Sequence, residues 1–413
     1  MKLWSKILIA MGLGILAGAF LGESAVLIKP VGTLFLNLIN MIIVLLVFSS
    51  MTVGITRIHD PKKLGRVGLK TLALYLGTTI VSILIGLCFA FYFKPGAASN
   101  LQLLSSEVSL TIEQSHSLSD IFLSIIPRNP IAALVSGNVL QIIVFSMFFG
   151  IAINFAGEKG RPLLEMVESL ADVMYRVTSI VMEFSPFGVF ALMAWISGTF
   201  GLQVLIPLGK FLLLYYAACA VHVLIVFVGL LRVMGRMSAM PFFKGMSDAI
   251  MVAFSTASSS ATLPVSMHCA QENLGVSKSI SSFVLPLGST VNMNGTAIYQ
   301  AMSAVFLAQV YSIQLDLYSI VTLVVTATLS SVGTAGIPGS GFIIMSAVLS
   351  SVGLPLEGIG LLAGIDRLRD MASSVLNILG DSVVAVLIAK QEGEWDESRY
   401  YQEEIVALEG SES

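Results

Sequence analysis

Charged residues, cysteines and histidines are scarce in this sequence. Charged residues make up 11% of its 413 positions, whereas a soluble domain carries about 25%. This shortage excludes a water-soluble globular enzyme, because so apolar a chain cannot cover itself with a polar surface. The three cysteines lie far apart in apolar runs, which excludes a disulfide framework and a cysteine metal site. The formal charge of −3 excludes a basic face for nucleic acid.

Apolar residues are abundant instead. Hydrophobic residues make up 56% of the chain and the mean hydropathy is +0.90. A membrane-spanning helix needs about 20 apolar residues, and uncharged stretches of this length recur. The N-terminus resembles the basic start of a signal peptide, but no cleavage site follows, so we expect a retained first span. The six simple spans predicted are residues 7–28, 31–56, 71–93, 129–157, 184–209 and 211–231.

The distribution of basic residues predicts the orientation. Residues 57–70 hold five basic side chains against a single aspartate, which predicts a cytoplasmic loop. The polar residues 94–128 then lie outside, and the acidic tail after Lys390 lies in the cytoplasm. The sequence therefore predicts a multi-pass protein of the plasma membrane, which in a prokaryote is the inner membrane.

Two uncharged segments in the second half do not suit continuous lipid-facing helices. Residues 249–271 contain a hydroxyl-rich centre at 255–262 followed by Pro264, and residues 317–356 contain a centre rich in Gly and Ser at 330–341. Such backbone is tolerated at membrane depth only where protein or a cavity surrounds it. Each segment predicts a re-entrant helical hairpin, and each precedes a long span, so the pair predicts an inverted repeat around a binding site. The alternative is a pair of small-residue helix-packing faces.

The span predicted at residues 280–315 is itself interrupted. Residues 290–296 place two asparagines, two threonines and a glycine in its middle. Unwound backbone there presents carbonyl oxygens, which are the ligands of a hard cation such as Na⁺. Simple hydrogen bonding between helices is the alternative.

The last span, residues 358–390, carries charged side chains. Ionisable groups inside a membrane are candidates for function. At 100° per residue, one face of this helix carries the polar residues Asp366, Asp370, Ser373, Ser374, Asn377 and Asp381. Arg367 and Arg369 fall at the margins of this stripe, where ion pairs with Asp366 are the structural alternative. The acidic stripe suits an ammonium group and cations, while hairpin N-termini suit a carboxylate.

Four motifs resemble a known family. They are the serines 258–260 with Pro264, Asn-Met-Asn-Gly-Thr at 292–296, Gly-Thr-Ala-Gly-Ile-Pro-Gly at 333–339 and Asn-Ile-Leu-Gly-Asp at 377–381. The chain is similar over nearly its whole length to the dicarboxylate/amino-acid:cation symporters, the glutamate transporter family. The resemblance implies an all-α polytopic membrane protein with eight transmembrane helices, two re-entrant hairpins and inverted repeats. It also implies a homotrimer and an elevator-type mechanism.

The resemblance divides the chain into a fixed scaffold and a mobile transport domain. The scaffold would comprise residues 1–70 and 129–209. The transport domain would comprise span 3 at 71–94, span 6 at 210–242, hairpin 1 at 243–279, span 7 at 280–315, the gating hairpin 2 at 316–356 and span 8 at 357–390. Residues 95–128 form an external loop and residues 391–413 a cytoplasmic tail.

The family's binding residues carry over position by position. The resemblance places the α-carboxylate on hairpin residues Ser258, Ser259, Ser260, Ile337, Pro338, Gly339 and Gly341, together with Asn377. It places the α-amino group on Asp370 and the side chain near Thr296, Ser373 and Ser374. One Na⁺ would bind at Gly288, Asn292, Asn377 and Asp381. A second would bind at Thr290, Ser331 and Thr334, and a third at Tyr75, Thr78, Thr79, Asn292 and Asn294.

Two positions depart from the family pattern. Members with acidic substrates carry an arginine where this chain has Ser373, and a hydroxyl does not replace a bidentate arginine–carboxylate pair. We therefore expect a cation-coupled, most simply Na⁺-coupled, symporter of small neutral amino acids. An acidic amino-acid or dicarboxylate symporter coupled to Na⁺ or H⁺ is the alternative, with Arg367 or Arg369 compensating. Members usually carry Asp in place of Asn294, so the third cation site is weakened here.

Two other classes of protein are disfavoured. A membrane-embedded serine hydrolase needs a histidine base near its nucleophile, and no histidine follows His268. A dedicated channel is at odds with an occluding hairpin gate. We therefore expect a transporter and not an enzyme, with no cofactor beyond the coupling ion. Its expected partners are the amino-acid substrate, the coupling cation, the lipid bilayer and further copies of the chain.

Overall fold

The chain is helical throughout the residues that a computed structural model describes, which are 3–56, 64–97, 126–137, 139–201, 205–331 and 339–401. Within these residues the single β pairing is an isolated bridge between Val276 and Trp395. A helix bonds its backbone groups internally, which is the condition for crossing hydrocarbon. Four helical stretches of the described chain are long and apolar enough to cross a membrane: Ile9–Phe35, Arg66–Phe93, Ile206–Val233 and Asp366–Glu392.

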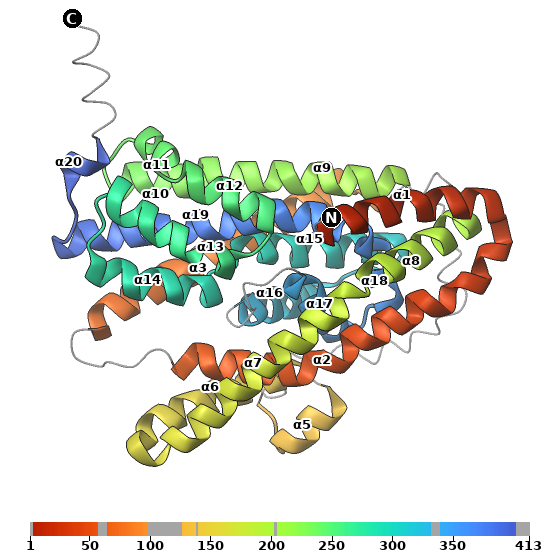
Figure 1. The fold of residues 1–413 in the computed structure, drawn as a ribbon, viewed down its shortest axis with the longest axis horizontal. Coiled ribbons are helices and arrows are strands. Elements are labelled where there is room, and N and C mark those ends of the chain that lie inside the picture. The colour runs from red at the N-terminus through yellow and green to blue at the C-terminus, as the bar shows by residue number, and fades with distance from the viewer. Residues whose placement is uncertain are drawn as a thin grey trace, which may run out of the picture.

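One group of helices comes from the N-terminal half, and its members α2, α7 and α8 run obliquely across Figure 1. It comprises α1 (Leu3–Leu21), η1 (Gly22–Ile28), α2 (Lys29–Thr56), α5 (Pro130–Ser136), α6 (Val139–Ala156), η3 (Gly157–Lys159), α7 (Arg161–Glu183) and α8 (Ser185–Phe200). Helix α1 packs along α8, and α2 packs against α6, α7 and α8. Small residues allow this approach, because a Cβ on Gly14 would lie 3.1 Å from the Cα of Phe190.

The other group surrounds α19, which spans Asp366–Glu392. It comprises α3 (Leu64–Phe93), α9 (Leu205–His222), η5 (Val223–Phe227), α10 (Val228–Val233), α11 (Ala239–Gly245), α14 (Lys278–Val291), α15 (Asn294–Val310) and the short α20 (Glu397–Tyr400). Helix α19 contacts α3, α9, α14 and α15, and Figure 1 shows it enclosed among them. Of the most apolar 18-residue stretch of this helix, 83% is buried inside the protein. The helix is therefore apolar but faces protein more than lipid.

The first polar segment forms two short helices with a break between them. Helix α12 (Ser247–Thr256) ends at Ala257, whose φ of +51° lies in the left-handed region. Helix α13 (Ser259–His268) then begins, continues into η6 (Cys269–Asn273) and packs against α12 and α19. The break lies inside the hydroxyl-rich run, where serine side chains favour helix caps, and Ser258 caps α13.

The second polar segment also gives two helices that pack together, α16 (Leu317–Ser331) and α17 (Ser340–Ser351). The predicted tip falls on residues 332–338, which lie outside the described residues. Helix α17 contacts α2 and α6, so this segment touches the other helix group. Two short elements, η7 (Leu356–Gly358) and α18 (Ile359–Ala363), lead from it to α19.

The interruption predicted at residues 290–296 is present. Helix α14 ends at Val291 and α15 begins at Asn294. Between them Asn292 adopts φ −107° and ψ 73°, and Met293 adopts φ −101° and ψ 60°. The last span is interrupted as well, because Gly364 and Ile365 separate α18 from α19. Both breaks bring polar backbone and side chains to the buried faces of α15 and α19.

Candidate substrate and cation site

The break between α14 and α15 meets the middle of α19 at a buried carboxylate. The Asn292 side-chain amide donates to Oδ1 of Asp381 over 2.9 Å, and its own carbonyl accepts from the Thr78 hydroxyl at 3.2 Å. Asp381 is 3% exposed. Within the described residues Asn292 is the only hydrogen-bond donor to Asp381, and no basic side chain there pairs with it. A buried carboxylate with so little compensation is costly, so the site calls for a cation.

Several neighbouring groups carry oxygen atoms that can bind a cation. A Cβ on Gly288 would collide with the Asp381 carboxylate and lie 2.6 Å from the Tyr75 hydroxyl, so only glycine lets these two groups approach. The Thr79 hydroxyl donates to the Asn294 side-chain carbonyl at 3.2 Å. Hydroxyl, amide and carboxylate oxygens are the ligands that hard cations prefer. The structure thus brings two predicted cation sets together on α3, the α14–α15 break and α19.

Asn377 holds the start of α15. Its Oδ1 accepts from the Gly295 N–H at 2.8 Å, and its Nδ2 lies 3.1 Å from the Met293 sulfur. It therefore satisfies a backbone donor at the helix N-terminus. Gly380, which the sequence analysis did not single out as a site residue, allows this packing. A Cβ there would lie 2.7 Å from Nδ2 of both Asn292 and Asn294.

Two members of the remaining predicted cation set lie at the C-terminal ends of α14 and α16. The Thr290 hydroxyl donates to the Leu287 carbonyl at 3.0 Å, and the Ser331 hydroxyl donates to the Thr328 carbonyl at 2.7 Å. Each hydroxyl thus bonds its own helix. Thr334, the third member of this set, lies outside the described residues.

The predicted substrate residues of the second hairpin lie beside α19. The N–H of Gly339 donates to Oδ2 of Asp370 over 3.0 Å. A Cβ on Gly341 would lie 3.1 Å from Cγ2 of Thr296, and the Thr296 and Ser373 hydroxyls are 3.4 Å apart. These residues of α15, α17 and α19 form one buried cluster. Ser374 is also buried, at 4% exposure, whereas Ile337 and Pro338 lie outside the described residues.

The serines of the first hairpin lie at the start of α13. Ser258 is the N-cap residue, and its hydroxyl accepts from the Ala261 N–H at 3.1 Å. Ser259 is buried and Ser260 is exposed. The Arg367 guanidinium ties this break to α19, because Nη2 donates to the Thr256 carbonyl at 2.9 Å.

Arg369 lies at the centre of the substrate cluster, whereas the sequence analysis placed it at the margin of the polar stripe. Its side chain is completely buried, and among the described residues no other arginine and no lysine is buried. Nε donates to Oδ1 of Asp366 at 2.9 Å and Nη1 donates to Oδ1 of Asp370 at 3.1 Å. Its Cζ lies 3.9 Å from the ring centroid of Tyr299. A helix projection missed this position because a long guanidinium reaches around the helix.

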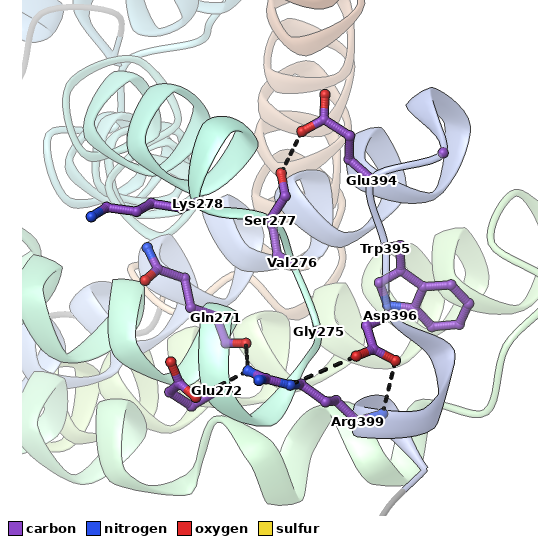
Figure 2. A pocket seen from close by; sticks show the side chains of 11 residues that line it. Gln271, Glu272, Gly275, Val276, Ser277, Lys278, Glu394, Trp395, Asp396 and Arg399 are labelled. Atoms are coloured by element: carbon purple, nitrogen blue, oxygen red, sulfur yellow. Dashed lines mark hydrogen bonds and ion pairs between the residues drawn. The ribbon is translucent and has the colours of Figure 1, made fainter.

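The opposite end of α19 carries a second polar feature, a surface pocket of about 530 Å³. The C-terminal segment 394–401 lies here against η6 and the start of α14, and we call this segment the C-terminal clamp. Figure 2 shows Arg399 of the clamp between Asp396 and the pair Gln271 and Glu272. The Asp396 N–H donates to the Gly275 carbonyl at 2.8 Å, and the Trp395 indole donates to the Leu274 carbonyl at 3.0 Å.

Asp396 also caps α20. Its carboxylate accepts from the Ser398 hydroxyl at 2.6 Å and from the backbone N–H groups of Ser398 and Arg399. These bonds, first that of the Ser398 hydroxyl, lower the pKa of Asp396 below its ordinary value. The charges of this region therefore stabilise the clamp.

A membrane bundle with broken helices and an acidic, oxygen-lined interior is typical of secondary transporters. The chain belongs to the Sodium:dicarboxylate symporter family, whose model matches residues 3–391. It is 38% identical over 403 residues to the proton/sodium-glutamate symport protein of Geobacillus stearothermophilus, covering 95% of each chain. It is 37% identical over 420 residues to the proton/glutamate-aspartate symporter of Escherichia coli (strain K12), covering 97% of this chain and 96% of the relative.

A third relative is the C4-dicarboxylate transport protein of Pseudomonas savastanoi pv. phaseolicola. It is 33% identical over 408 residues, which cover 97% of this chain and 88% of the relative. All three relatives are transporters and not enzymes, which confirms the predicted class, family and multi-pass membrane location. The names of these relatives refer to glutamate, aspartate or C4 dicarboxylates, and they favour the acidic alternative over the neutral amino acid expected from Ser373. That expectation depended on one position and discounted Arg369, which the structure buries four residues away.

Proposed function

We propose that this protein is a cation-coupled symporter of an acidic amino acid or C4 dicarboxylate, with Na⁺ as the coupling ion. The observation that carries the proposal is the buried Asp381 carboxylate, which has a single amide donor among the described residues and oxygen groups around it. A monovalent hard cation compensates this charge without needing a basic side chain. The acidic substrate class is supported by the relatives' names and by the buried Arg369.

The proposal includes the architecture expected from the family. The chain would have eight transmembrane helices and two re-entrant hairpins, α12–α13 and α16–α17. The packing of α1, α2, α6, α7 and α8 with one another supports their role as a scaffold. The packing of α3, α9, α14 and α15 around α19 supports a separate transport domain. Three such chains would assemble, and each transport domain would slide as an elevator with α16–α17 as its gate.

The coupling between cation binding and substrate binding follows from the elements that the two sites share. Asn377 and the α14–α15 break join the cation side to the substrate side, since Gly295 bonds Asn377 and Thr296 lies next to Ser373. A cation at Asp381 would therefore hold the break in the shape that positions Thr296. Binding of one ligand then favours the other by a coupling free energy of about 1–3 kcal/mol.

Uptake into liposomes tests the proposal. Purified full-length protein is reconstituted, and uptake of labelled L-aspartate is measured under an inward Na⁺ gradient, an inward proton gradient or neither. We expect accumulation with the Na⁺ gradient, and competition by L-glutamate or succinate that exceeds competition by L-alanine or L-serine. Stronger competition by alanine or serine would overturn the acidic substrate class. Accumulation driven only by the proton gradient would overturn Na⁺ as the coupling ion.

A further inference from the structure

Arg369 donates three hydrogen bonds of unequal length, two to Asp366 and one to Asp370. Nε and Nη2 both donate to Oδ1 of Asp366, at 2.9 and 2.5 Å, whereas Nη1 alone donates to Asp370, at 3.1 Å. An arginine has five N–H groups. Nη1 and Nη2 therefore each carry one further N–H group that these three bonds do not use. Asp366 therefore anchors the guanidinium, and Asp370 is its more weakly held partner.

The terminal nitrogens of Arg369 border the predicted substrate residues. A Cβ on Gly341 would lie 3.1 Å from Nη1 and 3.2 Å from Nη2, so the second hairpin packs closely against this edge of the guanidinium and a larger residue would crowd it. The same Cβ would lie 3.1 Å from Cγ2 of Thr296. Thr296 in turn faces Ser373 across 3.4 Å between their hydroxyls. The two hydroxyls and the guanidinium edge thus lie close together in the buried cluster.

The charges of this cluster are out of balance. Two carboxylates surround one guanidinium, so the cluster carries a net charge of −1 when all three groups are ionised. Asp370 is occupied on both oxygens, by Arg369 on Oδ1 and by the Gly339 N–H on Oδ2. An ammonium group can bind Asp370 best when Arg369 has another anion to bond. A substrate that brings both an ammonium group and a second carboxylate supplies that anion.

We propose that Arg369 is the residue that determines specificity for acidic substrates, an inference that rests on the proposed symport of such substrates. The substrate's side-chain carboxylate binds the Nη1–Nη2 edge with the Thr296 and Ser373 hydroxyls. It replaces Asp370 on Nη1, and Asp370 then accepts the substrate's ammonium group. Asp366 keeps the guanidinium in place throughout. L-Asparagine has the same shape as L-aspartate but lacks the charge that displaces Asp370.

The test compares L-aspartate with L-asparagine as competitors of labelled L-aspartate uptake by the full-length protein in liposomes. The test variant is Asp366→Asn with Arg369→Gln, which keeps the net charge of the cluster at −1. We expect the preference for aspartate over asparagine to fall roughly 10- to 100-fold, through a higher KM for aspartate. Competition by asparagine should stay within a few-fold. Adding Ser373→Arg should restore much of the preference, because it places a guanidinium one turn along the same helix face.

Lys390→Gln is the matched control, because Lys390 lies on the same helix but far from the cluster, with its ammonium over the Trp395 ring. It should leave the aspartate-to-asparagine ratio unchanged. A purely structural role for Arg369 predicts that both competitors weaken equally in the test variant, and this result would overturn the inference.

If the test variant does not fold, the variant Arg369→Lys provides the test. It should reduce the ratio several-fold because a lysine cannot bond bidentately, and an unchanged ratio contradicts the inference. A wild-type protein with no preference for aspartate would instead refute the proposed function.

Discussion

Asn292 donates a hydrogen bond to Asp381 over 2.9 Å, and this contact joins the break in one buried helix to the middle of another. The bond makes the shape of the break depend on the charge of one carboxylate. It also leaves that carboxylate with a single donor among the described residues, in an interior of low dielectric. The account of cation coupling follows from these two properties.

Gly288→Ala should impair cation binding. The new Cβ would collide with the Asp381 carboxylate and crowd the Tyr75 hydroxyl. We expect the Na⁺ concentration for half-maximal uptake to rise at least about tenfold, and the free energy of unfolding to fall by about 1–3 kcal/mol from overpacking. Gly77→Ala on α3 is the control, because its Cβ meets nothing within 4 Å. Equal effects of the two substitutions would argue against a packed site at Gly288.

Asn294→Asp should strengthen the third predicted cation set. The Asn294 side-chain carbonyl accepts from Thr79, while Nδ2 has no hydrogen-bond partner in the described structure. Replacing that nitrogen by a carboxylate oxygen removes an orphaned donor and adds a charge that a cation can neutralise. Measured by the dependence of uptake on Na⁺, the Hill coefficient should rise. An unchanged coefficient with normal uptake would show that this position binds no additional ion.

The C-terminal clamp should loosen at low pH. Because the pKa of Asp396 is lowered in the folded protein, its charge stabilises the clamp above the ordinary pKa of an aspartate. This contribution is lost as the pH falls through the lowered folded-state pKa. The protection of residues 394–401 against hydrogen exchange, measured relative to the intrinsic exchange rate at each pH, should therefore fall between about pH 5 and pH 3. In Asp396→Asn this protection should be lower at pH 7 and nearly independent of pH, and a persistent pH dependence of the protection there would assign the effect to another group.

The packing of the clamp gives a separate prediction. The Trp395 indole bonds the Leu274 carbonyl, and its ring lies 5.4 Å from that of Tyr400. Trp395→Ala should lower the free energy of unfolding by about 2 kcal/mol, because the side chain is only half-buried. The exposed Arg399→Ala should cost less than about 1 kcal/mol. Thermal melting of the two variants in detergent should show a larger loss of stability for Trp395→Ala than for Arg399→Ala, and a larger loss for Arg399→Ala would contradict this prediction.

Local chemistry made much of the fold predictable from the sequence. The break at 290–296 lies where an apolar span contains asparagines, threonines and a glycine, and the break at Ala257 lies in a run of serines and threonines, so both breaks could be predicted from the sequence. The polar face of α19 followed from the helical repeat, and Asp370, Ser373, Asn377 and Asp381 are all buried.

Tertiary contacts explain what the sequence left undetermined. The burial of Arg369 depends on Tyr299, Asp366 and Gly341, which come from three helices. The position of the C-terminal clamp depends on a bridge between Val276 and Trp395, which are far apart in the sequence. Neither relationship leaves a periodic pattern, so composition and spacing could not reveal it.

Thermal melting of the purified protein against Na⁺ concentration tests the central claim most directly. For the wild type the melting temperature should rise steadily with Na⁺, as expected for an ion that binds only the folded state. In Asp381→Asn the melting temperature without Na⁺ should be equal or higher, because a lone buried charge has been removed, and the rise with Na⁺ should disappear. Asp172→Asn, an exposed position, should behave as the wild type. An undiminished Na⁺-dependent rise in Asp381→Asn would contradict the account.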